Sequence, residues 1–419
     1  MLRTLKAVAA LLLGIGVMNL GNSLLGITLP LRMDAAHFTT FVTGLVMAAY
    51  FGGLLVGSIY VKMLIGKVGH IRAFAGLAAV MAAVALIHPL LFDGVTWAIL
   101  RFISGFCIAG LFAALESWLN ERSDNTTRGQ VLGIYMIVNY VAIVLGQLMV
   151  NLWDLNGMEA FMVASLLVSL SLVPVVLARV EAPDLSNLKP LSLRQLYAAS
   201  PLAPVGSCVA GAAMSAYFGL GPVFARQVGF DVFHVSLFMG SVILGGLLLQ
   251  WPIGRVSDRF DRRTVLLVVL GLGLLVCGAG IAMQTIADPF WPLIAVGLLL
   301  GGTMTTIYPI CVAQAFDYLS RDQYVAASAG LLMSYAIGST VGPILSALMI
   351  GEMGPYGFFA YIAACMAIFA AFVLYRVFVR APLPAARQEH VVSLPRMSPV
   401  GAALDPRAAP PASERTAGL

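Results

Sequence analysis

The sequence predicts an all-α polytopic membrane protein whose twelve transmembrane helices form two pseudo-symmetric six-helix bundles. Hydrophobic residues make up 60% of the 419 residues and charged residues only 10%, whereas soluble domains carry about 25% charged residues. The mean hydropathy is +0.94. The apolar residues form twelve long stretches, and the basic residues gather in alternate loops between them. A soluble chain of this size would need far more polar surface.

The distribution of basic residues predicts the orientation of the chain. All but three of the 24 Lys and Arg residues lie on the side of the N-terminus. Arg32 and Arg226 fall on the far side, and Arg101 lies inside a span. Because juxtamembrane Lys and Arg resist translocation, we expect both termini on the cytoplasmic side of a bacterial inner membrane. The net charge of +5 therefore reflects these loops and does not indicate a nucleic-acid partner.

Each apolar stretch has about 20 residues or more, which at 1.5 Å per residue crosses a hydrocarbon core of about 30 Å. The first stretch is too long for a signal-peptide core, so we expect a retained first helix. Basic loops follow the spans on one side, and loops almost without Lys or Arg follow them on the other. In order, the predicted spans are 7–31, 39–61, 72–92, 95–119, 129–152, 158–179, 200–222, 234–255, 264–286, 290–315, 325–350 and 356–379.

A polar, Pro-containing break divides these spans into two sets of six. We therefore predict an N-terminal bundle over 1–180, a cytoplasmic linker over 181–199 and a C-terminal bundle over 200–380. Residues 381–419 are rich in Pro, Ala, Ser and Arg without hydrophobic periodicity, which predicts a disordered cytoplasmic tail.

Glycines recur at one common offset between the two halves, which indicates duplication. Small residues at such positions let helix backbones approach closely in lipid. The matched pairs are Gly53 with Gly245, Gly105 with Gly297, Gly110 with Gly302, and Gly146 with Gly338.

The loop after the eighth span carries the most specific motif. Its sequence from Gly254 to Leu266 (GRVSDRFDRRTVL) resembles the major facilitator superfamily signature G-x-L-a-D-R-x-G-R-R/K-x-x-L, with Asp261 replacing the second glycine. The equivalent loop of the first half, Lys62–Arg72, is a degraded copy in which Gly66 replaces the aspartate.

Shorter elements support the same resemblance. Span four carries Arg101-Phe-Ile-Ser-Gly105, similar to the superfamily element R-x-x-x-G, and span eleven carries Gly338-Ser-Thr-Val-Gly342-Pro343, similar to G-x-x-x-G-P. The segment 68–74, with 116–122 and 128–129, is similar to the YcaD-like bacterial branch. The substrates of that branch are poorly defined, so the resemblance gives no ligand.

The resemblance implies a major facilitator fold and a monomeric secondary active transporter working by alternating access. Its expected partners are a small organic or amphiphilic solute, membrane lipids and protons, with proton-driven antiport in the export direction. Two alternatives stay open: a transporter of lipids or lipid-linked solutes, and a non-transporting membrane assembly or sensor protein. No GxSxG, Walker A or HExxH motif occurs, and neither the histidines nor the cysteines have metal-ligand spacing, so we expect neither an enzyme nor a cofactor.

Arg101 is the one cation within a predicted span. Burying it costs about 2.5–3.5 kcal/mol on insertion scales, so its side chain should face the bundle interior and find a partner. It could bind an anionic or zwitterionic substrate, or modulate a proton site. Alternatively, it could only hydrogen-bond neighbouring helices, for instance at Asn19 and Asn22 of the first span.

Two acids are candidates for proton coupling. Glu116 lies about 22 Å along the same helix from Arg101, too far to pair with it. Glu116 could carry a proton if it is partly buried, or it could pair with Lys67 or Arg72 in the adjacent basic loop. Asp34 ends the first span on the far side, and no acid is expected near the midplane.

The loop signature suggests a gate. Asp258 should lie near Arg128 at the start of the fifth span, where the positive end of the helix stabilises a carboxylate. With Arg259, Arg262 and Arg263, this contact would close the cytoplasmic side. Alternatively, these residues only set topology and cap their own turn. Because Gly66 replaces the aspartate in the first half, the two gates should be unequal.

Neutral polar side chains near the middle of the spans are candidates for the substrate site, which in such folds lies between the halves. Each could instead make only an interhelical hydrogen bond. The candidates are Asn19, Asn22, Tyr50, Asn139, Tyr140, Tyr217, Gln250, Thr303, Thr305, Thr306, Tyr308, Ser334 and Tyr335.

Overall fold

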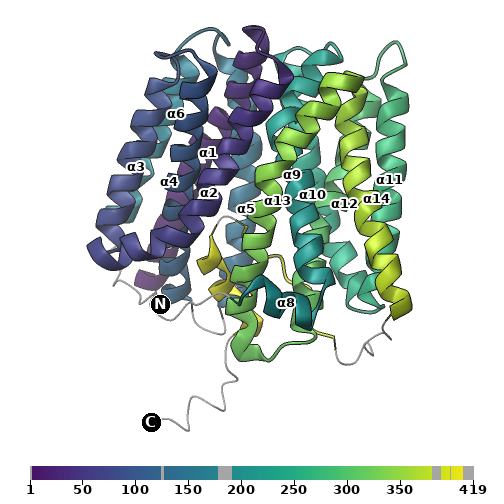
Figure 1. The fold of residues 1–419 in the computed structure, drawn as a ribbon. Coiled ribbons are helices and arrows are strands. Elements are labelled where there is room, and N and C mark those ends of the chain that lie inside the picture. The colour runs from purple at the N-terminus through teal and green to yellow at the C-terminus, as the bar shows by residue number, and fades with distance from the viewer. Residues whose placement is uncertain (1, 124–126, 178–190, 380–387, 397, 409–419) are drawn as a thin grey trace.

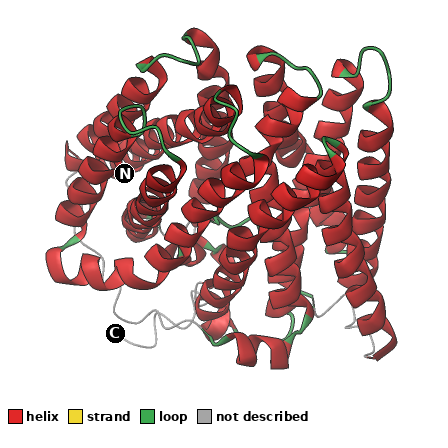
Figure 2. Ribbon diagram, turned by 45° about the horizontal axis from the view of Figure 1, so that its top comes forward, coloured by secondary structure: helices red, strands yellow, loops and turns green. Residues whose placement is uncertain are grey.

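The computed structural model describes residues 2–123, 127–177, 191–379, 388–396 and 398–408. Within these residues twelve helical segments are long and apolar enough to cross a membrane, as predicted. The sixth is broken at Ser171. Helices dominate the described residues and strands do not occur among them (Figure 2).

The elements follow one another as antiparallel helices joined by short loops. They are α1 (Leu2–Ala35), α2 (Thr40–Val68), α3 (His70–Ile87), α4 (Gly94–Arg122), α5 (Arg128–Leu148), η1 (Met149–Leu152), α6 (Glu159–Leu170), α7 (Leu172–Leu177), α8 (Leu193–Ala199), α9 (Leu202–Gln227), α10 (Val232–Ser257), α11 (Arg262–Met283), α12 (Phe290–Phe316), η2 (Arg321–Gln323), α13 (Tyr324–Met353), α14 (Tyr356–Val379), η4 (Pro399–Leu404) and η5 (Pro406–Ala408).

Helix α1 starts and α14 ends at the same end of the bundle, here called the terminal side (Figure 1). The other end is called the far side. Two turns on the far side are closed by aspartate caps: Asp93 accepts hydrogen bonds from the backbone N–H groups of Val95 and Thr96, and Asp231 accepts one from His234. Such caps stabilise a helix start by about 1 kcal/mol. These two turns are therefore stabilised by acidic residues, and the far side needs no basic residue there.

The two copies of the loop signature turn in different ways. Gly69, the glycine kept in the first copy, has φ 84° and joins α2 to α3. That conformation favours glycine. In the second copy Asp261 has φ −57°, so no glycine is needed. Its carboxylate instead caps α11 through the N–H of Arg263 (3.2 Å).

Helices α1–α7 form one half of the molecule and α9–α14 the other (Figure 1). In each half, glycines let neighbouring helix backbones touch. A Cβ on Gly53 would overlap the carbonyl of Phe102, and one on Gly245 would overlap that of Leu298. Gly105 packs against α2 as Gly301 packs against α10. The symmetry mate of Gly105 is therefore Gly301, one helical turn beyond the Gly297 that the sequence offset predicts.

The halves meet on the far side. A Cβ on Gly44 in α2 would lie 2.5 Å from the Cβ of Ala347 in α13. Arg226 Nε lies 3.7 Å from Asp34 Oδ2, and Asn151 donates a 2.7 Å hydrogen bond to Ser236. These contacts join α2 to α13, α9 to α1, and η1 to α10, so the far side is closed.

The structure describes part of the predicted tail. Residues 388–396 and 398–408 pack between the halves on the terminal side, where Leu394, Val400 and Leu404 are buried. The segment forms extended chain and two short 3₁₀ turns, which need no helical periodicity. Composition therefore could not predict its packing. Residues 181–190 of the predicted linker lie outside the described residues, and residues 191–199 contain α8.

The backbone contact at Gly53 gives a stability prediction. Gly53→Ala should lower the free energy of unfolding by about 1–3 kcal/mol, because the added methyl group must push α2 away from α4. Gly76→Ala in α3 is the control, since a Cβ there meets no atom within 4 Å. Thermal unfolding in detergent measures both variants, and equal effects would contradict this account of helix packing.

Candidate functional site

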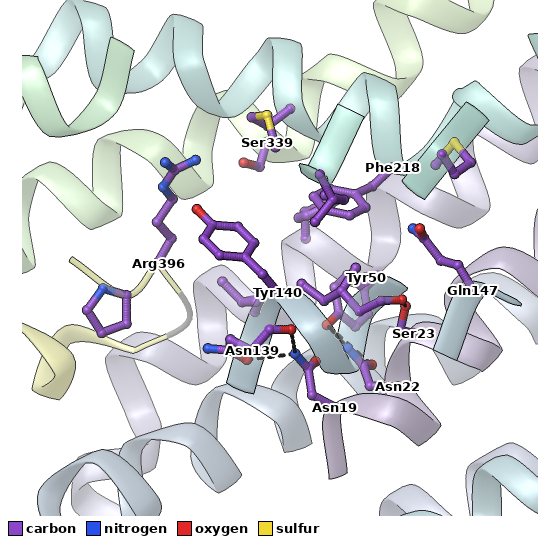
Figure 3. A pocket seen from close by; sticks show the side chains of 18 of the residues that line it. Asn19, Asn22, Ser23, Tyr50, Asn139, Tyr140, Gln147, Phe218, Ser339 and Arg396 are labelled. Carbon is purple, nitrogen blue, oxygen red and sulfur yellow. Dashed lines mark hydrogen bonds between the residues drawn. The ribbon is translucent and has the colours of Figure 1, made fainter. Parts of the chain in front are cut away.

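A central cavity of about 150 Å³ lies between the halves. Both halves and the tail contribute side chains to it (Figure 3). Its polar and charged lining residues are Asn19, Asn22, Ser23, Tyr50, Arg101, Asn139, Tyr140, Gln147, Thr305, Tyr335, Ser339 and Arg396, and its apolar ones include Met214, Phe218, Met239, Ile243, Leu394 and Pro395.

Most of the predicted binding residues gather at this cavity. Those on its wall are Asn19, Asn22, Tyr50, Arg101, Asn139, Tyr140, Thr305 and Tyr335. Tyr217 is not on the wall, because its hydroxyl donates to the carbonyl of Met239. Thr306 also turns away and donates to the carbonyls of Gly302 (3.0 Å) and Thr303 (2.9 Å). The buried ring of Tyr308 lies between these cases: it is not on the wall, but its centroid is 5.2 Å from that of Tyr335 and 5.4 Å from the guanidinium carbon of Arg396, which is.

The amides of α1 link it to its neighbours while facing the cavity. Asn19 Nδ2 donates to Asn139 Oδ1 (2.7 Å) in α5, and Asn22 Nδ2 donates to the hydroxyl of Tyr50 (3.2 Å) in α2. Figure 3 shows both pairs at the cavity wall. The expected interhelical hydrogen bonds therefore exist, and they also fix the amides in position at the wall.

Arg101 is buried beside Tyr50. Its guanidinium carbon lies 4.1 Å from the centroid of that ring, and only 3% of the residue is exposed. Within the part of the chain that the structure describes, Nε and Nη1 have no hydrogen-bond acceptor. The alternative of an arginine bonded to Asn19 or Asn22 is therefore not the arrangement found. Two donors of a buried cation therefore lack an acceptor, which is unusual inside a membrane span.

The two candidate coupling acids have different surroundings. Glu116 is fully buried, and the hydroxyl of Tyr135 donates to its Oε1 at 2.7 Å. The expected surface pairing of Glu116 with Lys67 or Arg72 is wrong, because this face of α4 turns into the bundle. Asp34 instead forms part of the contact between the halves, through Arg226.

The signature carboxylate does not contact the start of α5 in this structure. Asp258 Oδ1 accepts the backbone N–H of Val391 (2.7 Å), and Oδ2 lies 3.2 Å from Nδ1 of His390. Arg262 Nη1 lies 3.7 Å from the same carboxylate. In this conformation the tail occupies the position facing Asp258, so the contact with Arg128 stays a prediction for a state closed on this side.

The basic residues of the signature hold the end of α12 and their own turn. Arg262 donates to Asp317 from Nε (2.6 Å) and also to the carbonyl of Glu389 in the tail. Burial raises the pKa of the Asp317 carboxyl, while the ion pair with Arg262 acts in the opposite direction. Arg263 pairs with Asp261 (2.9 Å), and Arg259 is exposed.

Sequence reasoning missed the tail residues of the site. Leu394, Pro395 and Arg396 line the cavity, and Ser393 accepts a 2.6 Å hydrogen bond from Gln250. A signal was present in the segment 391–396 (VVSLPR), which combines apolar residues with one cation. It is too short for a periodicity argument. Among the described residues, no group of three or more His, Cys, Asp or Glu side chains could hold a metal ion.

Two six-helix halves around a central cavity, closed on one side, form the architecture of a secondary transporter. The chain belongs to the major facilitator superfamily, whose family model matches residues 11–277 and 205–409. Among curated proteins it is similar to the uncharacterized MFS-type transporter YcaD of Escherichia fergusonii, with 28% identity over 88% of this chain and 95% of that protein. The YcaD of Shigella flexneri matches with the same identity and coverage. The predicted resemblance to that branch is thus confirmed.

Solved structures show the same fold. The nucleoside transporter NupG matches with a TM-score of 0.69 and 14% identity over 90% of this chain and 98% of that one. A bacterial homologue of the human lysosomal transporter Spinster, in an inward-facing and occupied conformation, matches with a TM-score of 0.71 and 15% identity over 91% and 96%. At these identities the likeness extends to the fold and not to the substrates.

The hydrogen bond at Glu116 is directly testable. Tyr135→Phe should lower the free energy of unfolding by about 1–3 kcal/mol, because it removes a hydroxyl donor from a buried carboxyl group. Tyr60→Phe is the matched control, since Tyr60 is exposed. Thermal unfolding compares the two variants. No difference between them would mean that the Tyr135 hydroxyl does not stabilise the fold.

Proposed function

We propose that this transporter moves a small organic or amphiphilic solute across the bacterial inner membrane through the central cavity. The observation that carries the proposal is the buried guanidinium of Arg101 on the cavity wall, with donors that no described residue accepts. A solute carrying a carboxylate, phosphate or other strong acceptor would supply the missing partner. The Met, Phe and Tyr side chains around it suit an apolar body.

In this proposal the termini are cytoplasmic, and the structure corresponds to a state closed on the periplasmic side. Opening that side would separate α2 from α13 and break the Arg226–Asp34 pair. Closing the cytoplasmic side would bring Asp258 to the N–H groups at the start of α5, beside Arg128. Asp258 would then exchange the N–H of Val391 for a helix terminus, which is a comparable partner for a carboxylate.

Glu116 is the proposed proton carrier. It is buried, lies near the terminal side, and has a phenol as hydrogen-bond donor. A carboxyl group in such a place gains or loses its proton as access to water changes. A solute moving out while a proton moves in would give export by antiport, the scheme that the superfamily resemblance suggests.

The test of the site begins with finding a ligand. We would screen metabolites and drugs for thermal stabilisation of the purified protein, since a ligand present at a hundredfold excess over its Kd stabilises by about 2.7 kcal/mol. Hits would then be measured for flux in proteoliposomes. Solute flux that depends on the protein supports the proposal, and binding without flux of any hit contradicts it.

Arg101→Ala should weaken binding of such a hit by about ten- to a hundredfold, because hydrogen bonds to charged groups contribute about 1.5–3 kcal/mol. Arg255→Ala is the matched control, since Arg255 also stacks on an aromatic ring, that of Trp251 (3.7 Å), but outside the cavity. Isothermal titration calorimetry measures both. Equal affinities in the two variants would remove Arg101 from the binding site.

Glu116→Gln should abolish accumulation of the solute driven by a pH gradient while leaving solute exchange intact, because the amide cannot carry the proton. Glu121→Gln is the control on the same helix, at an exposed position. Proteoliposome uptake with and without an imposed gradient separates these outcomes. Gradient-driven accumulation that survives in Glu116→Gln would exclude this carrier.

A further inference from the structure

The tail of the chain enters the central cavity from the terminal side. Leu394 is only 2% exposed, and Pro395 and Arg396 form part of the cavity wall. Figure 3 shows the Arg396 side chain beside the ring of Tyr140. Ligand cavities for drug-sized molecules measure about 300–1,000 Å³, but the space left beside the tail is about 150 Å³. The tail therefore occupies room that a solute would need.

The guanidinium of Arg396 is held by a carbonyl that has no partner in its own helix. In α12 the N–H of residue 309 would normally bond to the carbonyl of Thr305, but Pro309 has no N–H. Arg396 Nη2 donates to this carbonyl oxygen at 2.7 Å. The free carbonyl is a permanent feature of α12, and any cationic donor could use it.

Aromatic rings complete the surroundings of the cation. The guanidinium carbon of Arg396 lies 5.4 Å from the ring centroid of Tyr308 and 5.9 Å from that of Tyr335. Both distances lie within the range of cation–π attraction. The described residues place no carboxylate within salt-bridge distance of Arg396. A carbonyl dipole and two ring faces thus hold the guanidinium of Arg396. A cation from solution could therefore replace Arg396 without leaving a buried anion unpaired.

We propose that the cavity contains a subsite for a guanidinium or ammonium group, formed by the carbonyl of Thr305 and the rings of Tyr308 and Tyr335. Arg396 of the tail is its resident occupant and competes with organic cations for it. This inference rests on the proposed function and narrows its substrate class to solutes with a cationic group. Arg101 lines the same cavity from the first half, so a solute with both a cation and a strong acceptor would engage both halves.

The seated tail also holds the halves apart on the terminal side. Turn η4 contacts α4 and α5 of the first half and α13 of the second. Ser398 and Gly401 lie beside the Glu116 carboxyl, and Gln250 bonds to Ser393. Closing this side requires the tail to leave. A cationic solute that displaces Arg396 would thus allow the terminal side to close.

The experiment compares butylguanidinium with its neutral analogue butylurea, titrated calorimetrically into the full-length protein. Arg396→Ala should bind butylguanidinium at least about tenfold more tightly than the wild type does, because apparent affinity falls with the fraction of molecules whose site is open. Arg396→Lys should resemble the wild type, since it keeps a cation on the tail. Butylurea affinity should stay weak in all three proteins.

A second variant tests the subsite itself. Adding Tyr335→Leu to Arg396→Ala should return butylguanidinium affinity to the wild-type level or below, with thermal unfolding reporting that the protein stays folded. Equal binding of butylguanidinium to the wild type and Arg396→Ala would overturn the inference. So would an equal gain for butylurea, which would mean that the tail only fills space.

These measurements need no flux, so they are independent of the proposed transport. If cation selectivity fails while a screened ligand still depends on Arg101, only this inference is lost. If no solute crosses proteoliposomes but Arg396→Ala gains butylguanidinium binding, the subsite stands and the transport proposal fails.

Discussion

The fold depends on how helices associate in lipid, where apolar burial gives no driving force between them. Association relies on close packing and on hydrogen bonds between helices. Gly53 and Gly245 let α2 and α10 touch the backbones of α4 and α12. Each half thus becomes a rigid unit with its own tight helix pair. Motion is then concentrated at the surfaces where the halves meet, which is where the cavity lies.

Polar groups inside such a structure must find partners, because water is scarce around them. Asn19 and Asn22 bond to neighbouring helices, and Glu116 Oε1 accepts from Tyr135. Arg101 retains donors without an acceptor, and the carbonyl of Thr305 is satisfied only by the tail. One half therefore offers an unmatched cation and the other an unmatched acceptor. The tail supplies a partner only for the carbonyl of Thr305, whereas a solute with both a cation and an acceptor could supply a partner for each.

Most of the fold could be predicted from the sequence, because apolar length defines each span and the loop signature is specific. Eight candidates reach the cavity wall because they lie at mid-span, Asn139 and Tyr335 among them. The direction in which each side chain points from its helix axis could not be predicted. Tyr217 and Thr306 point away from the wall, where their hydroxyl groups bond to backbone carbonyls. Asp258 contacts the tail and not α5, since its partner depends on which conformation the halves adopt. The packing of the tail could not be predicted, because its buried residues stand singly in irregular chain.

The central claim is that the two halves rock about the cavity. Pulsed electron spin resonance between pairs of spin labels tests this most directly, with one pair at exposed Val95 and Trp291 on the far side and one at exposed Val68 and Phe260 on the terminal side. Displacing the tail, by Arg396→Ala or by butylguanidinium, should give a population in which the far-side distance lengthens and the terminal-side distance shortens together. Distances that stay unchanged at both ends would contradict the account.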